Sequence, residues 1–236
     1  MKALILAAGM GSRLSPISDN IPKALVPVNG KPILVQQLEN LVDNGIHDIA
    51  VVVGYKGEAI RKLIRKRFDF VSVVENPNYA KTNNMYSAYL ARGWIDRSPF
   101  IMMNGDVFFD GRIIEDLLRN EEDNLICTDV GKYMEESMKV VEKDGRLVGI
   151  SKLIPSELSL GVSIDIYKFS EQSGYSFFEK CSEYIHGKRE LTLWSEVALN
   201  DILVHHRFVS CPISARWFEI DTLDDLVSAE ELFLVD

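Results

Sequence analysis

The sequence has few cysteines and no long apolar run. Among its 236 residues are three cysteines, Cys127, Cys181 and Cys211, an odd number at wide spacing. Neither a disulfide framework nor a zinc site is therefore expected. No stretch approaches the roughly 18 consecutive apolar residues of a membrane-spanning helix, and the N-terminal apolar stretch is too short for a signal peptide. These absences predict a protein of the reducing cytoplasm with no membrane partner.

Positive charge is also scarce. The chain has 26 Lys and Arg against 35 Asp and Glu, a formal net charge of -9, whereas a nucleic-acid-binding surface needs clustered positive charge. No nucleic-acid partner is therefore expected, although a few cations in a cleft can still bind a small anionic ligand. The length fits a single domain over residues 1–236, acting as a monomer or homodimer.

The first half of the chain alternates strands and helices. Strands that are buried on both faces appear as short, almost continuous apolar runs. Such runs occupy residues 2–7, 48–53, 70–75 and 99–103. Helical patterns lie between them, at 32–44, 56–67 and 84–94. This alternation predicts an α/β fold with a Rossmann-like, mostly parallel sheet flanked by helices.

The second half changes character. Residues 138–152 read as two short strands around Asp144-Gly145, a pair that accepts positive φ in a turn. The elements expected after this hairpin are a strand at 161–168, a helix near 174–187, a strand at 206–213 and a closing helix from about 222. They predict a partly antiparallel C-terminal portion folded over the sheet.

A glycine-rich turn follows the first strand, in the sequence LILAAGMGSRLSP. Glycines and small residues let backbone N–H groups face a triphosphate without obstruction by Cβ atoms. Arg13 can supply a permanently charged, planar fork to phosphate oxygens, and Lys23 follows ten residues later. A dinucleotide-binding G-x-G-x-x-G is not present, because its last position is Leu14, and the P-loop pattern is absent. A plain turn that needs glycine only for geometry is the remaining alternative.

Two segments together, Leu6-Ala7-Ala8-Gly9-x-Gly11-Ser12-Arg13-Leu14 and Pro22-Lys23-Ala24-Leu25, resemble the signature of the sugar-phosphate nucleotidyltransferase superfamily. The resemblance implies a nucleotide-binding part at 1–135, and an acceptor-binding and metal-completing part at 136–236. In the first part the loop would hold base and phosphates, Arg13 would position pyrophosphate, and Lys23 would bind phosphate. The nucleotide-binding residues expected are Leu6, Ala7, Ala8, Gly9, Gly11, Ser12, Asn83, Asn84 and Asp106.

Two aspartates are candidate ligands for Mg²⁺, which prefers oxygen donors. Asp106 follows the buried run PFIMM at a strand end, where a carboxylate is costly unless it is capped, paired or metal-bound. A simple turn role is the alternative. Asp221, in WFEIDT, precedes a helical pattern, so it could instead be a helix N-cap. The resemblance implies that a late aspartate in this position completes the metal site.

The region that would bind the acceptor departs from the glucose-type members of the superfamily. Where they carry G-T-A, this chain has Asn83-Asn84-Met85-Tyr86-Ser87-Ala88, which resembles phosphocholine cytidylyltransferases and related bacterial enzymes of surface-polymer synthesis. That resemblance implies CTP as the nucleotide. The acceptor-binding candidates are Tyr86, Lys139, Lys152, Trp194, Glu196, Trp217 and Glu219. Their aromatic and acidic character would suit a quaternary ammonium, although core packing or solvent exposure explains several of them equally well.

The resulting hypothesis is an Mg²⁺-dependent cytidylyltransferase. It would transfer CMP from CTP to a small phosphorylated metabolite, giving a CDP-linked product for surface polysaccharide or lipid decoration, and release pyrophosphate. Two alternatives remain open from the sequence. One is a related enzyme, either a sugar-1-phosphate uridylyl- or thymidylyltransferase or a methylerythritol-phosphate-type cytidylyltransferase. The other is a regulatory module that binds nucleotide without turnover.

Overall fold

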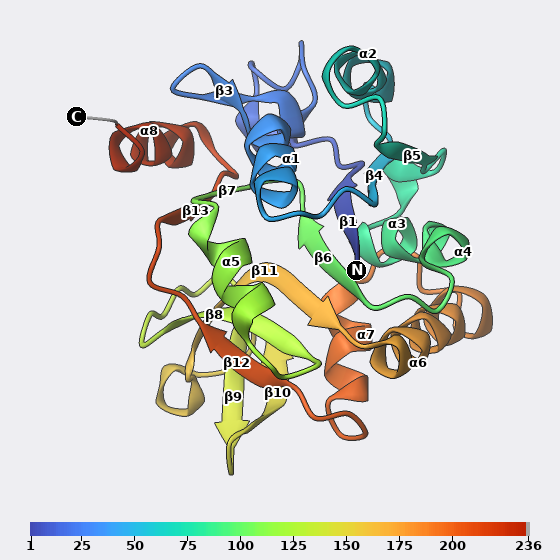
Figure 1. Cartoon of the computed structure of the whole chain (residues 1–236), viewed down its shortest axis with the longest axis vertical. Coiled ribbons are helices and arrows are strands. Elements are labelled where there is room, and N and C mark those ends of the chain that lie inside the picture. The colour runs from blue at the N-terminus through green and yellow to red at the C-terminus, as the bar shows by residue number, and fades with distance from the viewer. Residues whose placement is uncertain (235–236) are drawn as a thin grey trace.

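The computed structural model describes residues 1–234, and its central feature is a nine-stranded sheet with helices on both sides (Figure 1). Four adjacent strands, in the order β6-β1-β4-β5, are parallel. They are β1 (Lys2–Ala7), β4 (Ile49–Val53), β5 (Ser72–Glu75) and β6 (Phe100–Asn104). The mostly parallel sheet predicted from the apolar runs is therefore confirmed.

The rest of the sheet is mostly antiparallel. Strand β11 (Gly161–Phe169) pairs antiparallel with β6, β8 and β9, and so joins the two halves of the chain. The remaining strands are β8 (Leu125–Val130), β9 (Lys139–Lys143), β10 (Arg146–Ser151) and β12 (Val209–Pro212). The hairpin β9–β10 turns at Asp144 and Gly145, both with positive φ, as the sequence predicted.

Helices cover both faces of the sheet, because the parallel strands are apolar on both sides. On one face, Ala3, Ile5 and Ala7 pack in a core with α1 (Ile33–Asp43), α2 (Gly57–Arg67) and α5 (Arg112–Arg119). On the other face, Leu4 and Leu6 pack with three helices. They are α3 (Asn84–Leu90), α6 (Glu171–Ser182) and α7 (Ser195–Ile202). The strict alternation along β1 fixes which side chains reach each core.

Several boundaries differ from the sequence prediction for identifiable reasons. The region 84–94 forms two helices, α3 and the short α4 (Arg92–Ile95). Helix α6 begins at Glu171 because the Ser170 side chain caps it by accepting from the Ser173 backbone N–H at 3.2 Å. Its C-terminal end widens into a π-helical turn over Glu183–Gly187. Pro32 is the N-cap of α1 and does not lie within its first turn.

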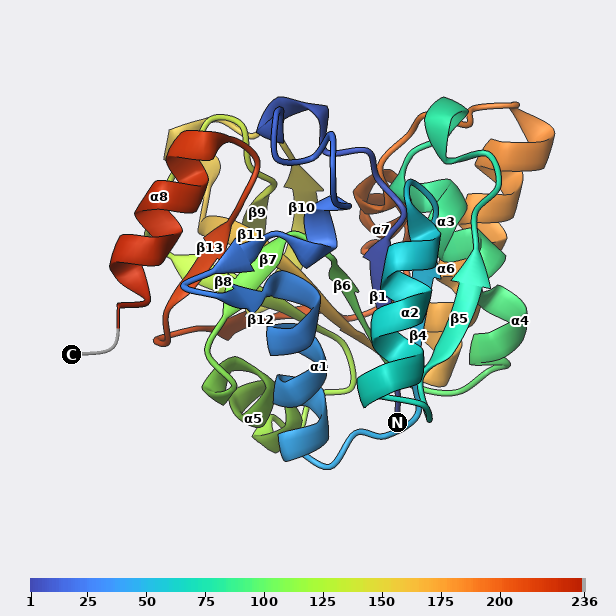
Figure 2. The ribbon, with the colours of Figure 1, turned by 90° about the horizontal axis from the view of Figure 1, so that it is seen from above.

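The C-terminal helix returns to the N-terminal segment. Helix α8 (Leu223–Leu232) packs beside two small hairpins that lie outside the main sheet, as Figure 2 shows. One hairpin is β2 (Pro27–Val28) with β3 (Lys31–Pro32), and the other is β7 (Val107–Phe109) with β13 (Trp217–Glu219). Leu226 and Ala229 of α8 share a buried apolar cluster with Leu14, which follows Arg13 in the glycine-rich turn. Within residues 1–234, no helix is both long and apolar enough to cross a membrane.

Gly161, at the start of β11, should be intolerant of any side chain. A Cβ atom there would lie 2.3 Å from the Asp129 carbonyl oxygen of β8 and 2.8 Å from the Val130 Cα. We expect Gly161→Ala to separate the two strands and to lower the free energy of unfolding by about 1–3 kcal/mol, measured by urea denaturation. The matched control is Gly93→Ala, because a Cβ at Gly93 meets nothing within 4 Å. Equal stability of the two variants would contradict the expectation.

Candidate active site

The carboxyl ends of β1 and β6 open into a cleft of ≈ 260 Å³, the position in which open parallel sheets bind ligands. Fourteen of the side chains or backbone positions predicted from the sequence line it. These are Leu6, Ala7, Ala8, Gly9, Arg13, Lys23, Asn83, Asn84, Asp106, Lys152, Trp194, Glu196, Glu219 and Asp221. Five predicted residues are not part of its wall: Gly11, Ser12, Tyr86, Lys139 and Trp217.

The glycine-rich turn places its cations through tight backbone geometry. Gly11 has a φ of 61°, in the left-handed region that favours glycine. A Cβ there would also lie 2.9 Å from the Lys23 Cβ, so Gly11 allows Lys23 to pass directly beneath the turn. Ser12 then begins a short 3-10 helix, Ser12–Leu14, anchored by the fully buried Leu14. Gly11 and Ser12 therefore support the turn, and the exposed Arg13 side chain reaches the cleft.

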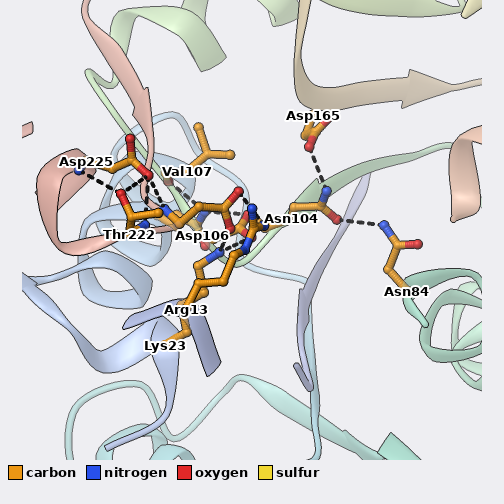
Figure 3. Close-up of polar contacts among 11 residues, drawn as sticks. Arg13, Lys23, Asn84, Asn104, Asp106, Val107, Asp165, Thr222 and Asp225 are labelled. Atoms are coloured by element: carbon orange, nitrogen blue, oxygen red, sulfur yellow. Dashed lines mark hydrogen bonds and ion pairs between the residues drawn. The ribbon is translucent and has the colours of Figure 1, made fainter. Parts of the chain in front are cut away.

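Lys23 is the cation at the centre of the site. Its Nζ donates to Asp106 Oδ2 at 2.7 Å and to Asp221 Oδ1 at 2.6 Å (Figure 3). Arg13 adds an ion pair to the second carboxylate, with Nη2 2.8 Å from Asp221 Oδ2. Burial alone would lower the pKa of Lys23, but the two carboxylates raise it above its ordinary value. Burial would likewise raise the pKa of Asp221, yet the charges of Lys23 and Arg13 hold it below its ordinary value.

Three carboxylates gather where the sequence predicted two. Asp106, Glu219 and Asp221 each offer an oxygen, and these oxygens lie within 4.8 Å of one another. Asp106 Oδ1 is buried and has no hydrogen-bond partner within residues 1–234. Burial and the negative charges of Asp165, Asp106 and Asp221 raise the pKa of Glu219 to about 9. An oxygen-only set with an unpaired buried oxygen fits a hard divalent cation, so Glu219 belongs with the metal candidates.

Asn83 and Asn84 join two parts of the cleft wall. Asn83 caps α3, and its Nδ2 donates to the Thr192 carbonyl at 3.2 Å. The Asn84 Oδ1 accepts from the Ser195 backbone N–H at 2.8 Å, while its Nδ2 lies 3.4 Å from Asn104 Oδ1 (Figure 3). These amides hold the segment before α7 against the start of α3.

A buried polar network that the sequence reasoning missed lies beside Asn104. Its Nδ2 donates to Asp165 Oδ2 at 2.8 Å (Figure 3). Asp165 has a φ of 59° within a strand, where the pairing of β11 with β8 shifts register, and this bulge turns the residue toward the cleft. The Tyr167 hydroxyl lies 2.8 Å from Asp165 Oδ1 and 2.9 Å from Glu196 Oε1. A lone aspartate within the apolar run GVSIDIYKF was the available signal.

Burial shifts the pKa values of the two carboxyl groups in this network, Asp165 and Glu196. Burial first, and then the charge of Glu196, raise the pKa of Asp165 to about 7. Burial also raises the pKa of Glu196. Two carboxyl groups that share one hydroxyl in a desolvated place resist being ionised together.

Three predicted acceptor-binding residues are engaged elsewhere. Lys139 is 1% exposed and donates from Nζ to the Glu135 carbonyl at 2.7 Å, so it fixes the loop before β9. Trp217 donates from Nε1 to Asp129 Oδ2 at 2.9 Å. The Tyr86 hydroxyl accepts from Asn78 Nδ2 at 3.2 Å. Lys152 does line the cleft, with its Nζ 4.9 Å from the centre of the Trp194 ring.

Known proteins resemble this chain over its whole length. The choline-phosphate cytidylyltransferase of Streptococcus pneumoniae is 30% identical over 98% of both chains. The CTP:phosphoglutamine cytidylyltransferase of Campylobacter jejuni is 24% identical, over 96% of this chain and 98% of its own length. Other relatives are longer proteins, of whose length this chain spans 20% to 58%.

Fold comparison agrees with these similarities. A solved structure of the CTP:phosphocholine cytidylyltransferase from Streptococcus pneumoniae superposes with a TM-score of 0.84 and 25% identity, covering 99% of each chain. A model of the MobA-like NTP transferase domain matches residues 3–150, which include the glycine-rich turn, Lys23 and Asp106. The chain therefore belongs to the family of MobA-like NTP transferase domains.

Proposed function

We propose that the protein is an Mg²⁺-dependent cytidylyltransferase that transfers CMP from CTP to a small phosphorylated acceptor and releases pyrophosphate. One observation carries the proposal. Arg13 from the glycine-rich turn and Lys23 beneath it meet Asp106 and Asp221 in a single cleft. The whole-length similarity to enzymes named for choline phosphate and phosphoglutamine favours CTP as the donor and a phosphate-bearing acceptor.

The chemistry requires positioning and charge more than proton transfer. An acceptor phosphate oxygen is already ionised at neutral pH, so it can attack the α-phosphorus of CTP without a general base. Backbone N–H groups of the turn, Arg13 and Lys23 would hold the β- and γ-phosphates in line with that attack. When bound by Asp106, Glu219 and Asp221, the divalent cation supplies positive charge that offsets the charge on the phosphates. Lys152, which lines the cleft beside Trp194, would hold the acceptor phosphate.

The nucleotide preference is the direct test of the proposal. A cytosine presents an amino donor where uracil presents a carbonyl acceptor, and a mismatched buried group costs about 1–3 kcal/mol. We therefore expect a kcat/KM for CTP about ten- to a hundredfold above that for UTP, with negligible use of ATP and GTP. Pyrophosphate release with the four NTPs measures it. Preference for UTP or dTTP would favour a sugar-1-phosphate uridylyl- or thymidylyltransferase, and no turnover with any NTP would favour a regulatory module.

The carboxylates Asp106 and Asp221 should be essential. Asp106→Asn and Asp221→Asn keep the side-chain size but remove a charged oxygen donor, so each should lower kcat on the order of a hundredfold or more at saturating Mg²⁺. The matched control is Asp224→Asn, on the exposed first turn of α8, which should keep full turnover. Near-normal activity in either site variant would show that this residue is not a ligand.

The two lysines of the cleft should act on different substrates. Lys23 contacts the carboxylates beneath the glycine-rich turn, whereas Lys152 lies beside Trp194. We expect Lys23→Met to lower kcat with CTP on the order of a hundredfold, because it removes the charged group that would face the departing pyrophosphate. Lys152→Met should instead raise the KM of the acceptor and leave the KM of CTP unchanged. Steady-state kinetics with each substrate varied separates the two roles, and identical effects would refute them.

A further inference from the structure

The cleft carries excess negative charge. Six acidic residues line the whole cleft: Asp106, Glu136, Asp165, Glu196, Glu219 and Asp221. Against them stand three basic residues, Arg13, Lys23 and Lys152. Three of the acids form the metal cluster, where Lys23 and Arg13 also lie. The charge of Lys152 also acts on Asp221. Glu136, Asp165 and Glu196 therefore line the cleft without an ion-pair partner among residues 1–234.

Glu196 has an oxygen with no partner. The residue is 2% exposed, and its Oε2 is buried without a hydrogen-bond partner among residues 1–234. An unpaired buried carboxylate oxygen costs about 1–3 kcal/mol or more. Since Glu196 forms part of the cleft wall, a hydrogen-bond donor on a ligand would relieve that cost.

The other oxygen of Glu196, Oε1, shares the hydroxyl proton of Tyr167 with Asp165. The Tyr167 hydroxyl lies within hydrogen-bond distance of both Glu196 Oε1 and Asp165 Oδ1, but a phenol has only one proton to donate. The Ser195 hydroxyl, 3.2 Å from Glu196 Oε1, is a further donor to the same oxygen. Asn104 donates to the other oxygen of Asp165, and no basic side chain within residues 1–234 forms an ion pair with Asp165 or Glu196. The acid pair therefore lacks a cationic partner.

The cleft offers little for a cation that lacks N–H groups. A quaternary ammonium is usually held against aromatic faces, and three aromatic residues were expected to form such a lining. Trp217 lies outside the cleft, with the Lys132 Nζ 4.5 Å from its ring centre. Tyr86 also lies outside. The Trp194 ring is already covered by Lys152, and Tyr79 lines the nucleotide side, where it abuts Gly54.

We propose that the acceptor's end distal to its phosphate is an ammonium group carrying N–H bonds, a primary or secondary amine, bound by Glu196 and Asp165. This inference rests on the proposed transferase function and specifies the acceptor that the function leaves open. Tyr167 and Asn104 position the two carboxylates, and Lys152 keeps the phosphate end apart from them. The recognition is by charge together with hydrogen-bond donation, so methylation of the nitrogen weakens it stepwise.

The test is an acceptor series in which only the group distal to the phosphate changes. The substrates compared, with whichever NTP is active, are phosphoethanolamine, its N-methyl and N,N-dimethyl derivatives, and phosphocholine. The series also includes 2-hydroxyethyl phosphate, whose distal hydroxyl group is uncharged. We expect kcat/KM to fall with each methyl group. Phosphocholine and 2-hydroxyethyl phosphate should each be about ten- to a hundredfold poorer than phosphoethanolamine. Calorimetry with a non-transferable CTP analogue bound gives the same ranking as affinities, independently of turnover.

The variant Glu196→Gln tests whether Glu196 binds the ammonium group of the acceptor. It should raise the KM of phosphoethanolamine at least tenfold, leave the KM of CTP unchanged, and abolish the preference over 2-hydroxyethyl phosphate. Glu190→Gln, an exposed residue of the preceding loop that does not line the cleft, is the matched control and should change neither. Asp165→Asn should reduce the same preference. If Glu196→Gln does not fold, the acceptor series with the unmodified protein still decides the question.

The outcomes are distinguishable. Phosphocholine or 2-hydroxyethyl phosphate equal to or better than phosphoethanolamine would overturn the amine assignment, while CTP-dependent turnover with them would leave the transferase proposal standing. Absence of turnover with every NTP, together with the expected ranking of affinities, would overturn the transferase proposal and support the amine site. Unchanged acceptor preference in a folded Glu196→Gln variant would show that the preference arises elsewhere.

Discussion

The contact on which the site depends is the Lys23 ammonium held between Asp106 and Asp221. These carboxylates lie 83 and 198 residues away along the chain, so one cation joins the glycine-rich turn, the end of β6 and the segment before α8. Without it, three half-buried carboxylates would lie within 4.8 Å with only the exposed Arg13 to balance them. Burial first, and then the negative charges of Asp165, Asp106 and Asp221, raise the pKa of Glu219 even with Lys23 present.

The same arrangement explains how a charged substrate can enter a site whose charges are already paired. A triphosphate alone would meet Asp106 and Asp221, and a divalent cation alone would meet the ammonium of Lys23. When the triphosphate and the divalent cation bind together, the charges balance. Phosphate oxygens can then pair with Lys23 and Arg13, while the carboxylates bind the divalent cation. Each charged side chain thus gains a new partner as it loses the old one. No charge is left desolvated and unpaired, which would be costly in a half-buried site.

The nucleotide half of the molecule could be predicted from the sequence because its determinants are local. Apolar runs identify strands buried on both faces, and Gly11, Arg13 and Lys23 fall within one short segment. The acceptor half could not be predicted to the same depth. Lys139 and Trp217 lie on strands, and which face of a strand meets the cleft depends on pairing that the sequence does not state. The left-handed turn at Asp165 has even less signal, because it follows from a register shift between β11 and β8.

The residues of the two parts of the site also differ in their coverage by the family model. The turn, Lys23 and Asp106 lie within the matched residues 3–150, whereas Asp165, Glu196, Glu219 and Asp221 lie beyond them. Under the proposed function, the triphosphate site lies within the matched residues and the metal ligands come from both parts of the chain. The proposed amine site lies on β11 and at the start of α7. A single substitution there, such as an aromatic residue in place of Glu196, would change the class of acceptor without touching the triphosphate cradle. Under this assignment, relatives that share the transfer step need not share its acceptor.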